Sequence, residues 1–298
     1  MDLRALGMGL AFAFMWSSAF TSARIIVAHA PPLGISALRF LIAGTLAVAL
    51  ARAQGQSWRL TTSQARLTVV FGICQNALYL GLFFVAMQTI EASLAAIIAS
   101  TMPLLVAVAS WAVLGERMRA LGVVGLLAGF TGVALIMGSR LQAGGADPVG
   151  IGLCLVGVLA LTFATLSVRG ASSGGNVLMI VGLQMLVGAA VLMPASLLLE
   201  AWRIDWSLGF VLAFAYTVIV PGLIATMVWF LLVRRIGAVK AATFHFLNPF
   251  FGVAVAALLL GERLGPLDAV GVVIIMAGIL AVQLSRQASS AQKDQPRG

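Results

Sequence analysis

Leu114-Gly115-Glu116-Arg117 returns 146 residues later as Leu260-Gly261-Glu262-Arg263. Around this tetrapeptide, residues 86–138 are echoed by residues 232–284 at the same offset. The aligned positions include Pro103 with Pro249, Gly125 with Gly271 and Gly132 with Gly278. Both segments are strongly apolar. A repeat of this kind indicates two copies of one membrane unit.

The composition excludes an ordinary soluble domain. Hydrophobic residues make up 61% of the chain and charged residues 9%, whereas soluble domains carry roughly 25% charged residues. The 298 residues leave room for about ten spans of roughly 20 apolar residues each. The net charge of +9 does not indicate a nucleic-acid partner, because the basic residues lie between apolar spans. We therefore predict an all-α integral membrane protein with the lipid bilayer as its surroundings.

Turn signals divide the chain into ten predicted transmembrane helices. The clearest breaks are Pro31-Pro32 and residues 144–148 and 172–175. The predicted ranges are 4–28, 33–51, 64–87, 92–113, 119–138, 149–168, 177–199, 207–232, 238–259 and 265–285. We interpret the first as a retained helix rather than a cleaved signal peptide, because Leu6–Ala28 is long enough to span.

The distribution of basic residues predicts the topology. In the ten-helix arrangement, thirteen of the 18 lysines and arginines fall on the side that bears the chain's ends. Both termini are therefore expected in the cytoplasm. We assign residues 1–143 to a first repeat, residues 144–285 to a second, and residues 286–298 to a disordered cytoplasmic tail. Five helices per repeat is an odd number, so the second repeat enters the membrane inverted, which suits alternating access around a central site.

The chain resembles the EamA-type carriers of the drug/metabolite transporter superfamily. The resemblance rests on Trp16-Ser17-Ser18-Ala19-Phe20, on Leu38-Arg39-Phe40 and on the duplicated Pro…Gly-Glu-Arg…Gly pattern, and it covers essentially the whole chain. Within that superfamily the chain looks most like bacterial exporters of aromatic amino acids of the YddG kind. The resemblance implies a ten-helix carrier in the bacterial inner (plasma) membrane, with a central cavity from which amino acids are exported.

Polar and aromatic side chains share faces of two predicted helices. Phe244, His245 and Asn248 lie on one arc of the ninth helix, and polar groups at that depth are costly in lipid. Asn76, Tyr79 and Phe83 lie on one face of the third helix. Each set could equally form hydrogen bonds and packing contacts between helices.

Further rings on the first and sixth helices could stack on an aromatic ligand. The predicted substrate-binding residues are Trp16, Phe20, Asn76, Tyr79, Phe83, Phe163, Phe244, His245 and Asn248.

Prolines, arginines and glycines leave alternatives open. Pro103 and Pro249 fall at matching positions inside the fourth and ninth helices, as static kinks or as hinges. Arg24 and Arg39 could bind a carboxylate, although we favour side chains that reach for the membrane interface. The glycines of the fifth helix indicate close packing within one subunit or between two, which leaves a homo-oligomer open.

Several kinds of chemistry lack a sequence signature. No Asp or Glu lies at the middle of a span, and we find neither a phosphate-binding loop nor a metal-ligand cluster. Nor can a nucleophile with acid–base partners be assembled. We expect no enzymatic activity, no cofactor and no metal, and a small-molecule substrate moved without ion coupling. The alternatives are efflux of hydrophobic drugs or other small metabolites, and proton coupling through His245.

Overall fold

The computed structural model describes residues 3–116, 118–142, 147–167 and 175–293, and these residues form helices and connecting turns without strands. Ten of the described segments are long and apolar enough to cross a membrane. They are Leu3–Val27, Pro32–Ala53, Thr62–Ala86, Ala92–Val113, Ala120–Leu141, Pro148–Ser167, Val177–Leu199, Leu208–Ile236, Lys240–Leu260 and Pro266–Ala288. The ten predicted helices are confirmed, and each predicted end lies within four residues of the end of the corresponding membrane span.

Four of the ten spans are not continuous α-helices. The third consists of α3 (Thr62–Phe71), a π-helical segment η1 (Gly72–Leu80) and α4 (Gly81–Ala86), and the eighth of α10 (Leu208–Thr217), π-helical η2 (Val218–Ile224) and α11 (Ala225–Ile236). The fourth is split into α5 (Ala92–Ala99) and α6 (Met102–Leu114), and the ninth into α12 (Ala238–Thr243), 3-10 helical η3 (Phe244–Leu247) and α13 (Asn248–Leu260). The unbroken helices are α1 (Leu3–Val27), α2 (Pro32–Ala53), α7 (Ala120–Gln142), α8 (Pro148–Ser167), α9 (Val177–Leu199) and α14 (Pro266–Lys293).

The chain separates into two compact units. Unit 1 comprises Met1–Thr21, Glu91–Asp147 and Ile224–Gly298, and unit 2 comprises Ser22–Ile90 and Pro148–Leu223. Each unit takes helices from both predicted repeats, so the units of packing do not coincide with the repeats of the sequence.

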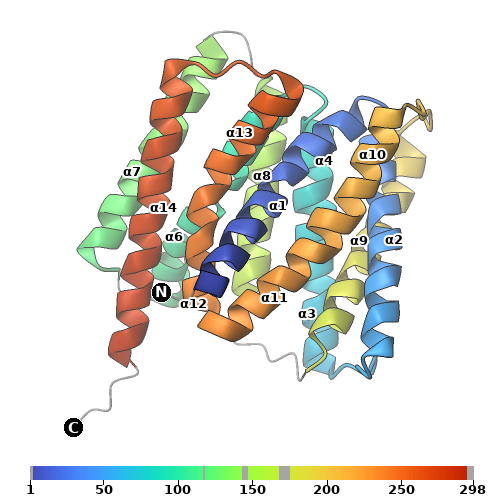
Figure 1. The fold of residues 1–298 in the computed structure, drawn as a ribbon, viewed down its shortest axis with the longest axis horizontal. Coiled ribbons are helices and arrows are strands. Elements are labelled where there is room, and N and C mark those ends of the chain that lie inside the picture. The colour runs from blue at the N-terminus through green and yellow to red at the C-terminus, as the bar shows by residue number, and fades with distance from the viewer. Residues whose placement is uncertain (1–2, 117, 143–146, 168–174, 294–298) are drawn as a thin grey trace. The chain divides into compact units, whose positions relative to one another are not determined.

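Glycines let two helices of unit 1 pack backbone against backbone. Helices α7 and α14 lie side by side (Figure 1). A Cβ atom on Gly125 would lie 2.7 Å from the carbonyl oxygen of Gly278, and one on Gly132 would lie 2.9 Å from that of Gly271. Because the contact order reverses along the chain, the two helices run antiparallel. The glycine seam predicted from the sequence is thus a contact within one chain.

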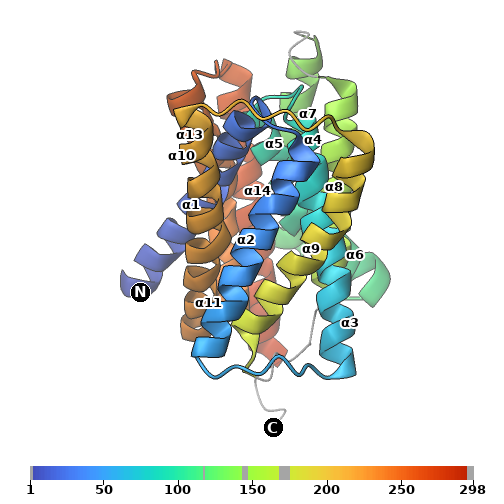
Figure 2. The ribbon, with the colours of Figure 1, turned by 90° about the vertical axis from the view of Figure 1, so that its right-hand side faces the viewer.

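In unit 2, α2 and α9 form a comparable pair (Figure 2). A Cβ atom on Gly44 or on Gly182 would lie 2.9 Å from the carbonyl oxygen of the other glycine. The first turn of each helix is capped by a residue that follows its partner. Glu200, after α9, accepts hydrogen bonds from the backbone N–H groups of Leu33 and Gly34 in α2, at 2.8 and 2.9 Å. The side-chain oxygen Oε1 of Gln56, after α2, accepts one from the N–H of Met179 in α9 at 3.0 Å.

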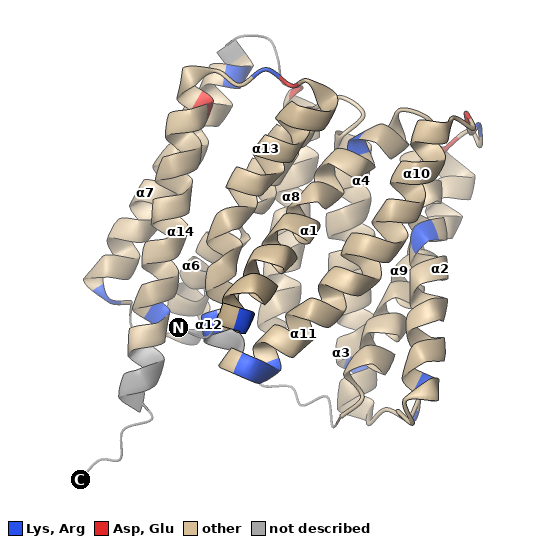
Figure 3. Ribbon diagram, viewed as in Figure 1, with Lys and Arg blue, Asp and Glu red and all other residues tan. Residues whose placement is uncertain are grey.

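Basic residues gather at one end of unit 1. Figure 3 shows lysine and arginine where α1 begins, where α11 ends and in α12, and acidic residues near the opposite end, where α14 begins. Helix α1 begins and α14 ends toward the same end of the unit (Figures 1 and 2). That this end faces the cytoplasm stays a prediction.

The tail begins later than predicted. Instead of ending near residue 285, α14 continues to Lys293. The Arg286 guanidinium holds this extension by donating from Nη2 to the Ser110 hydroxyl at 3.0 Å, and the alanines and glutamines beyond it favour a helix. Residues 294–298 of the predicted disordered tail lie outside the described residues.

Candidate functional site

A histidine–asparagine pair lies where the ninth span changes its helical form. His245 belongs to η3, and Asn248 begins α13. The Asn248 amide Nδ2 lies 3.0 Å from His245 Nδ1. Since an amide nitrogen can only donate, Nδ1 accepts and the neutral imidazole carries its proton on Nε2. The Asn248 Oδ1 atom is buried and has no hydrogen-bond partner among the described residues, so the pair retains an open acceptor.

Aromatic rings surround this pair. The Phe12 ring meets the His245 ring edge-on at a centroid distance of 5.3 Å, and the Trp229 ring lies 5.2 Å from it. Phe12 also contacts Trp229 at 4.7 Å and Trp16 at 5.7 Å. The structure therefore places Trp16, which the sequence analysis selected, in the same aromatic cluster as His245. Phe12 and Trp229 were not predicted from the sequence, although Phe12 lies one helical turn before Trp16.

Two other predicted residues of unit 1 are packing residues in this structure. Phe244 packs against a core cluster of Ala5, Leu232 and Ala241. Its ring fills the space above Gly9, where a Cβ atom would lie 2.3 Å from it. Phe20, one turn after Trp16, is buried with 7% of its surface exposed.

The predicted residues of the third span are buried inside unit 2. Asn76 donates from Nδ2 to the backbone carbonyl of Gln184 at 2.8 Å, which satisfies its amide between helices. The rings of Tyr79 and Phe83 lie 4.7 Å apart, and a Cβ atom on Gly157 would lie 3.0 Å from the Phe83 ring. The structure therefore favours the packing interpretation for Asn76 and Phe83.

Phe163, the predicted binding residue of the sixth span, is not buried with Asn76, Tyr79 and Phe83. Its side chain is 59% exposed on α8, whereas Asn76, Tyr79 and Phe83 are buried. Helical spacing predicts which residues share a face, but it cannot tell whether that face meets protein or lipid.

The π-helical segments occur at equivalent places in the two predicted repeats. Gly72–Leu80 and Val218–Ile224 begin 146 residues apart, which is the offset of the sequence repeat. Such segments are rare in proteins, and many of those known lie at functional sites. Pro221 lies inside the second one and lacks the N–H that a regular turn requires. Neither π-helical segment was predicted from the sequence, in which Pro221 was the only signal for either.

The two prolines predicted to lie inside helices lie instead in the first turn of a new helix. Pro103 follows the break at Ser100 and Thr101, and Pro249 follows η3. A first-turn proline loses no hydrogen bond, because that N–H has no partner within the helix. At the first break, the hydroxyls of Ser100 and Thr101 donate to carbonyls of the preceding turn, at 2.7 Å each.

An arginine that the sequence analysis expected at the membrane interface is buried in unit 2. Arg39 is 7% exposed, and its guanidinium carbon lies 4.3 Å from the centroid of the Phe40 ring and 4.5 Å from that of Phe84. Its Nε atom has no hydrogen-bond partner, and neither has the buried hydroxyl of Ser36 one turn earlier. The burial of Arg39 in unit 2 argues against the prediction that its side chain reaches for the membrane interface.

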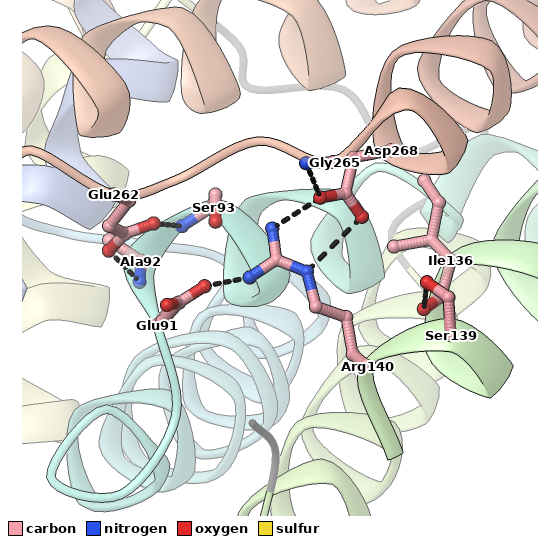
Figure 4. Close-up of polar contacts among 9 residues, drawn as sticks. All are labelled: Glu91, Ala92, Ser93, Ile136, Ser139, Arg140, Glu262, Gly265 and Asp268. Carbon is pink, nitrogen blue, oxygen red and sulfur yellow. Dashed lines mark hydrogen bonds and ion pairs between the residues drawn. The ribbon is translucent and has the colours of Figure 1, made fainter. Parts of the chain in front are cut away.

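Charged residues link four spans at one end of unit 1 (Figure 4). Arg140, on α7, donates from Nε and Nη2 to both oxygens of Asp268, on α14, at 3.1 and 2.9 Å, and from Nη1 to Glu91. Glu262, after α13, accepts hydrogen bonds from the backbone N–H groups of Ala92 and Ser93 at 2.8 and 3.0 Å. These groups satisfy one another and hold the ends of the spans together. Among the described residues, no group of three His, Cys, Asp or Glu side chains is placed to hold a metal ion.

Comparison with known proteins gives one family. A model of the EamA-like transporter family matches this chain twice, over residues 3–138 and 148–284. The "Uncharacterized transporter YvbV" of Bacillus subtilis is 27% identical, over 93% of this chain and 90% of its own length. The "Uncharacterized inner membrane transporter YedA" of Escherichia coli K12 is 28% identical, over 95% of this chain and 92% of its own. A solved structure, described only as the crystal structure of a protein, shares the fold with a TM-score of 0.70 at 22% identity, covering 97% of this chain and 99% of that one. None of these names states a substrate.

Proposed function

This chain belongs to the EamA-like transporter family, and on that premise we propose that it exports amino acids, aromatic or other neutral ones, by alternating access. It is a multi-pass transporter of the bacterial inner membrane, not an enzyme. The amino-acid substrate, the direction of transport and the mechanism are the proposal. The likeness to aromatic amino acid exporters of the YddG kind rests on the sequence resemblance alone.

The observation that carries the proposal is the aromatic cluster around His245 and Asn248. It combines three large rings with a neutral imidazole whose Nε2–H is a donor and with an unpartnered amide oxygen. Rings bind the apolar part of a small amphipathic molecule, and a few polar groups orient its head. Polar residues at this depth are costly unless they have a function or a partner.

Alternating access is supported by the broken spans. The fourth and ninth spans are interrupted at equivalent places, just before Pro103 and Pro249, and we propose that these breaks act as hinges. In the sequence repeat, Gly125 corresponds to Gly271 and Gly132 corresponds to Gly278. Exchanging each glycine for its counterpart therefore turns the contact of Gly125 with Gly278 into the contact of Gly271 with Gly132, and both contacts are observed. A two-fold relation of this kind fits two inverted repeats, residues 1–143 and 144–285. Such repeats can give two related packings, open to opposite sides of the membrane.

The alternative function is efflux of hydrophobic drugs or other small metabolites, with or without proton coupling. It is favoured by the same rings, because Phe12, Trp16 and Trp229 outnumber the polar groups beside them. Drug flux that amino acids do not inhibit would establish this alternative.

The test is flux in proteoliposomes that contain the purified protein. We expect uptake of phenylalanine and other neutral amino acids above protein-free liposomes, unchanged when a pH gradient is collapsed. Stimulation by an imposed pH gradient would contradict uncoupled transport. Absence of amino-acid flux alongside drug flux would contradict the substrate assignment.

A further inference from the structure

Arg39 presents a charge without a counter-charge in unit 2. It lies seven residues into α2, about 10 Å along the helix from its first residue. Its contacts are the faces of the Phe40 and Phe84 rings, and no hydrogen bond or ion pair reaches it from the described residues. A buried charge is costly unless it is paired, and an unsatisfied buried group needs an explanation.

The acidic residues of unit 2 do not supply the missing partner. Only Glu200 and Asp205 carry carboxylates among its described residues. Both oxygens of Glu200 are occupied by the first turn of α2, and the Ser196 hydroxyl donates to one of them at 2.6 Å. The Asp205 side chain is 78% exposed and lies beside His29 at 4.0 Å. Arg24, another arginine of unit 2, differs from Arg39 in that its Nη1 donates a hydrogen bond to the backbone carbonyl of Met87.

The surroundings of Arg39 have the features of a carboxylate site. Ser36 lies three residues before Arg39 and so on the same face of α2, and it is fully buried with an unpartnered hydroxyl. The two rings hold the guanidinium plane by cation–π contact, which leaves its N–H groups free for the paired hydrogen bonds that a carboxylate accepts.

We propose that Arg39 and Ser36 form a binding site for the carboxylate group of the transported molecule. The inference rests on the proposed function, and it narrows the substrate class to small organic acids and zwitterions. Cationic and uncharged drugs lack the group that this site takes. The serine hydroxyl donates one hydrogen bond to the carboxylate, and the guanidinium donates the others.

The test is ligand binding by the purified full-length protein in detergent, measured by calorimetry with three related compounds. Phenylalanine has both charged groups, 3-phenylpropionate has only the carboxylate, and phenethylamine has only the amine. We expect Arg39→Gln to weaken phenylalanine and 3-phenylpropionate about 10- to 100-fold and to leave phenethylamine unchanged. Ser36→Ala should weaken the two acids about 3- to 10-fold. Arg24→Gln is the matched control and should change none of the three.

Each other outcome decides the matter. Equal losses for phenethylamine and the acids in Arg39→Gln would reduce the arginine to a packing role and overturn the proposal. If Arg39→Gln does not fold, Ser36→Ala and Arg39→Lys give the same comparison. Stabilisation of the wild type by phosphatidylglycerol, with no effect of either acid, would assign the site to a lipid phosphate and also overturn it. Arginine-dependent binding of the acids without any amino-acid flux would uphold the site and refute the proposed function.

Discussion

Removal of Asp268 tests whether the charged network of unit 1 stabilises the fold. Asp268 accepts three hydrogen bonds, two from Arg140 at 3.1 and 2.9 Å and one from the backbone N–H of Gly265 at 2.8 Å. The side chains of Arg140 and Asp268 are 10% and 5% exposed. The change Asp268→Ala therefore leaves a buried guanidinium with one partner fewer and the start of α14 without its cap.

The expected loss follows from this burial. Breaking a buried ion pair from one side costs about 3–5 kcal/mol. Arg140 keeps Glu91 as a second partner, so we expect the lower end, about 3 kcal/mol of unfolding free energy, for Asp268→Ala. Asp268→Asn retains an oxygen for the Gly265 N–H and should cost about 1–2 kcal/mol.

The measurement is reversible unfolding in detergent micelles with increasing sodium dodecyl sulfate, followed by circular dichroism. Asp205→Ala is the control, because its side chain is 78% exposed, and it should change stability by no more than about 0.5 kcal/mol. The double variant Asp268→Ala with Arg140→Met should lose less than the sum of the two single losses, since it leaves no buried guanidinium behind. The Glu91 carboxylate, which also loses Arg140, is 36% exposed. A loss for Asp268→Ala no larger than that of the control would refute the reasoning.

Three further predictions concern the site and the helix seam. His245→Gln should reduce flux about 10-fold or more, with normal membrane expression, if its Nε2–H binds substrate. His29→Gln is the matched control, and equal flux in the two variants would show that His245 does not bind substrate. Gly278→Ala should lower stability in the same unfolding assay by about 1–3 kcal/mol, because the new Cβ would lie 2.6 Å from the opposing backbone. Gly138→Ala, with open space around its Cβ position, should be neutral or stabilising, and a similar result at Gly278 would exclude close packing there. Pro249→Ala should alter the maximal flux more than the half-saturating substrate concentration, and an unchanged maximal flux would exclude a hinge.

The sequence was sufficient to predict the spans and the family. Apolar length sets the helices, because a bilayer demands about 20 apolar residues with internally satisfied backbone. Turn signals such as Pro31-Pro32 place the boundaries within four residues. The repeated Gly-Glu-Arg pattern pointed to the family that the comparison identifies.

The site was predicted only in part, for two physical reasons. Hydropathy does not register a shift from α- to π-helical hydrogen bonding, so η1 and η2 had no sequence signal beyond Pro221. Nor does it tell whether an arginine near a helix end finds water or a protein interior. Arg39 is enclosed by Phe40 and Phe84, and the second of these rings comes from a different span. The structure brings Trp16 and His245, both selected from the sequence, into one aromatic cluster around Phe12. Phe163, also selected, lies instead on an exposed face of α8.

Two helices of the first half of the chain are capped by glutamates of the second half, and this has a consequence for biogenesis. The first turn of α2 obtains its carboxylate acceptor from Glu200, and that of α5 from Glu262. When only the first five spans have been synthesised, α2 and α5 have entered the bilayer, but the glutamates that accept hydrogen bonds from their first-turn N–H groups do not yet exist. Unit 2 becomes complete once Leu223 is inserted, but unit 1 must wait for α14. These two contacts between distant parts of the chain can therefore form only after the second half of the protein has been inserted.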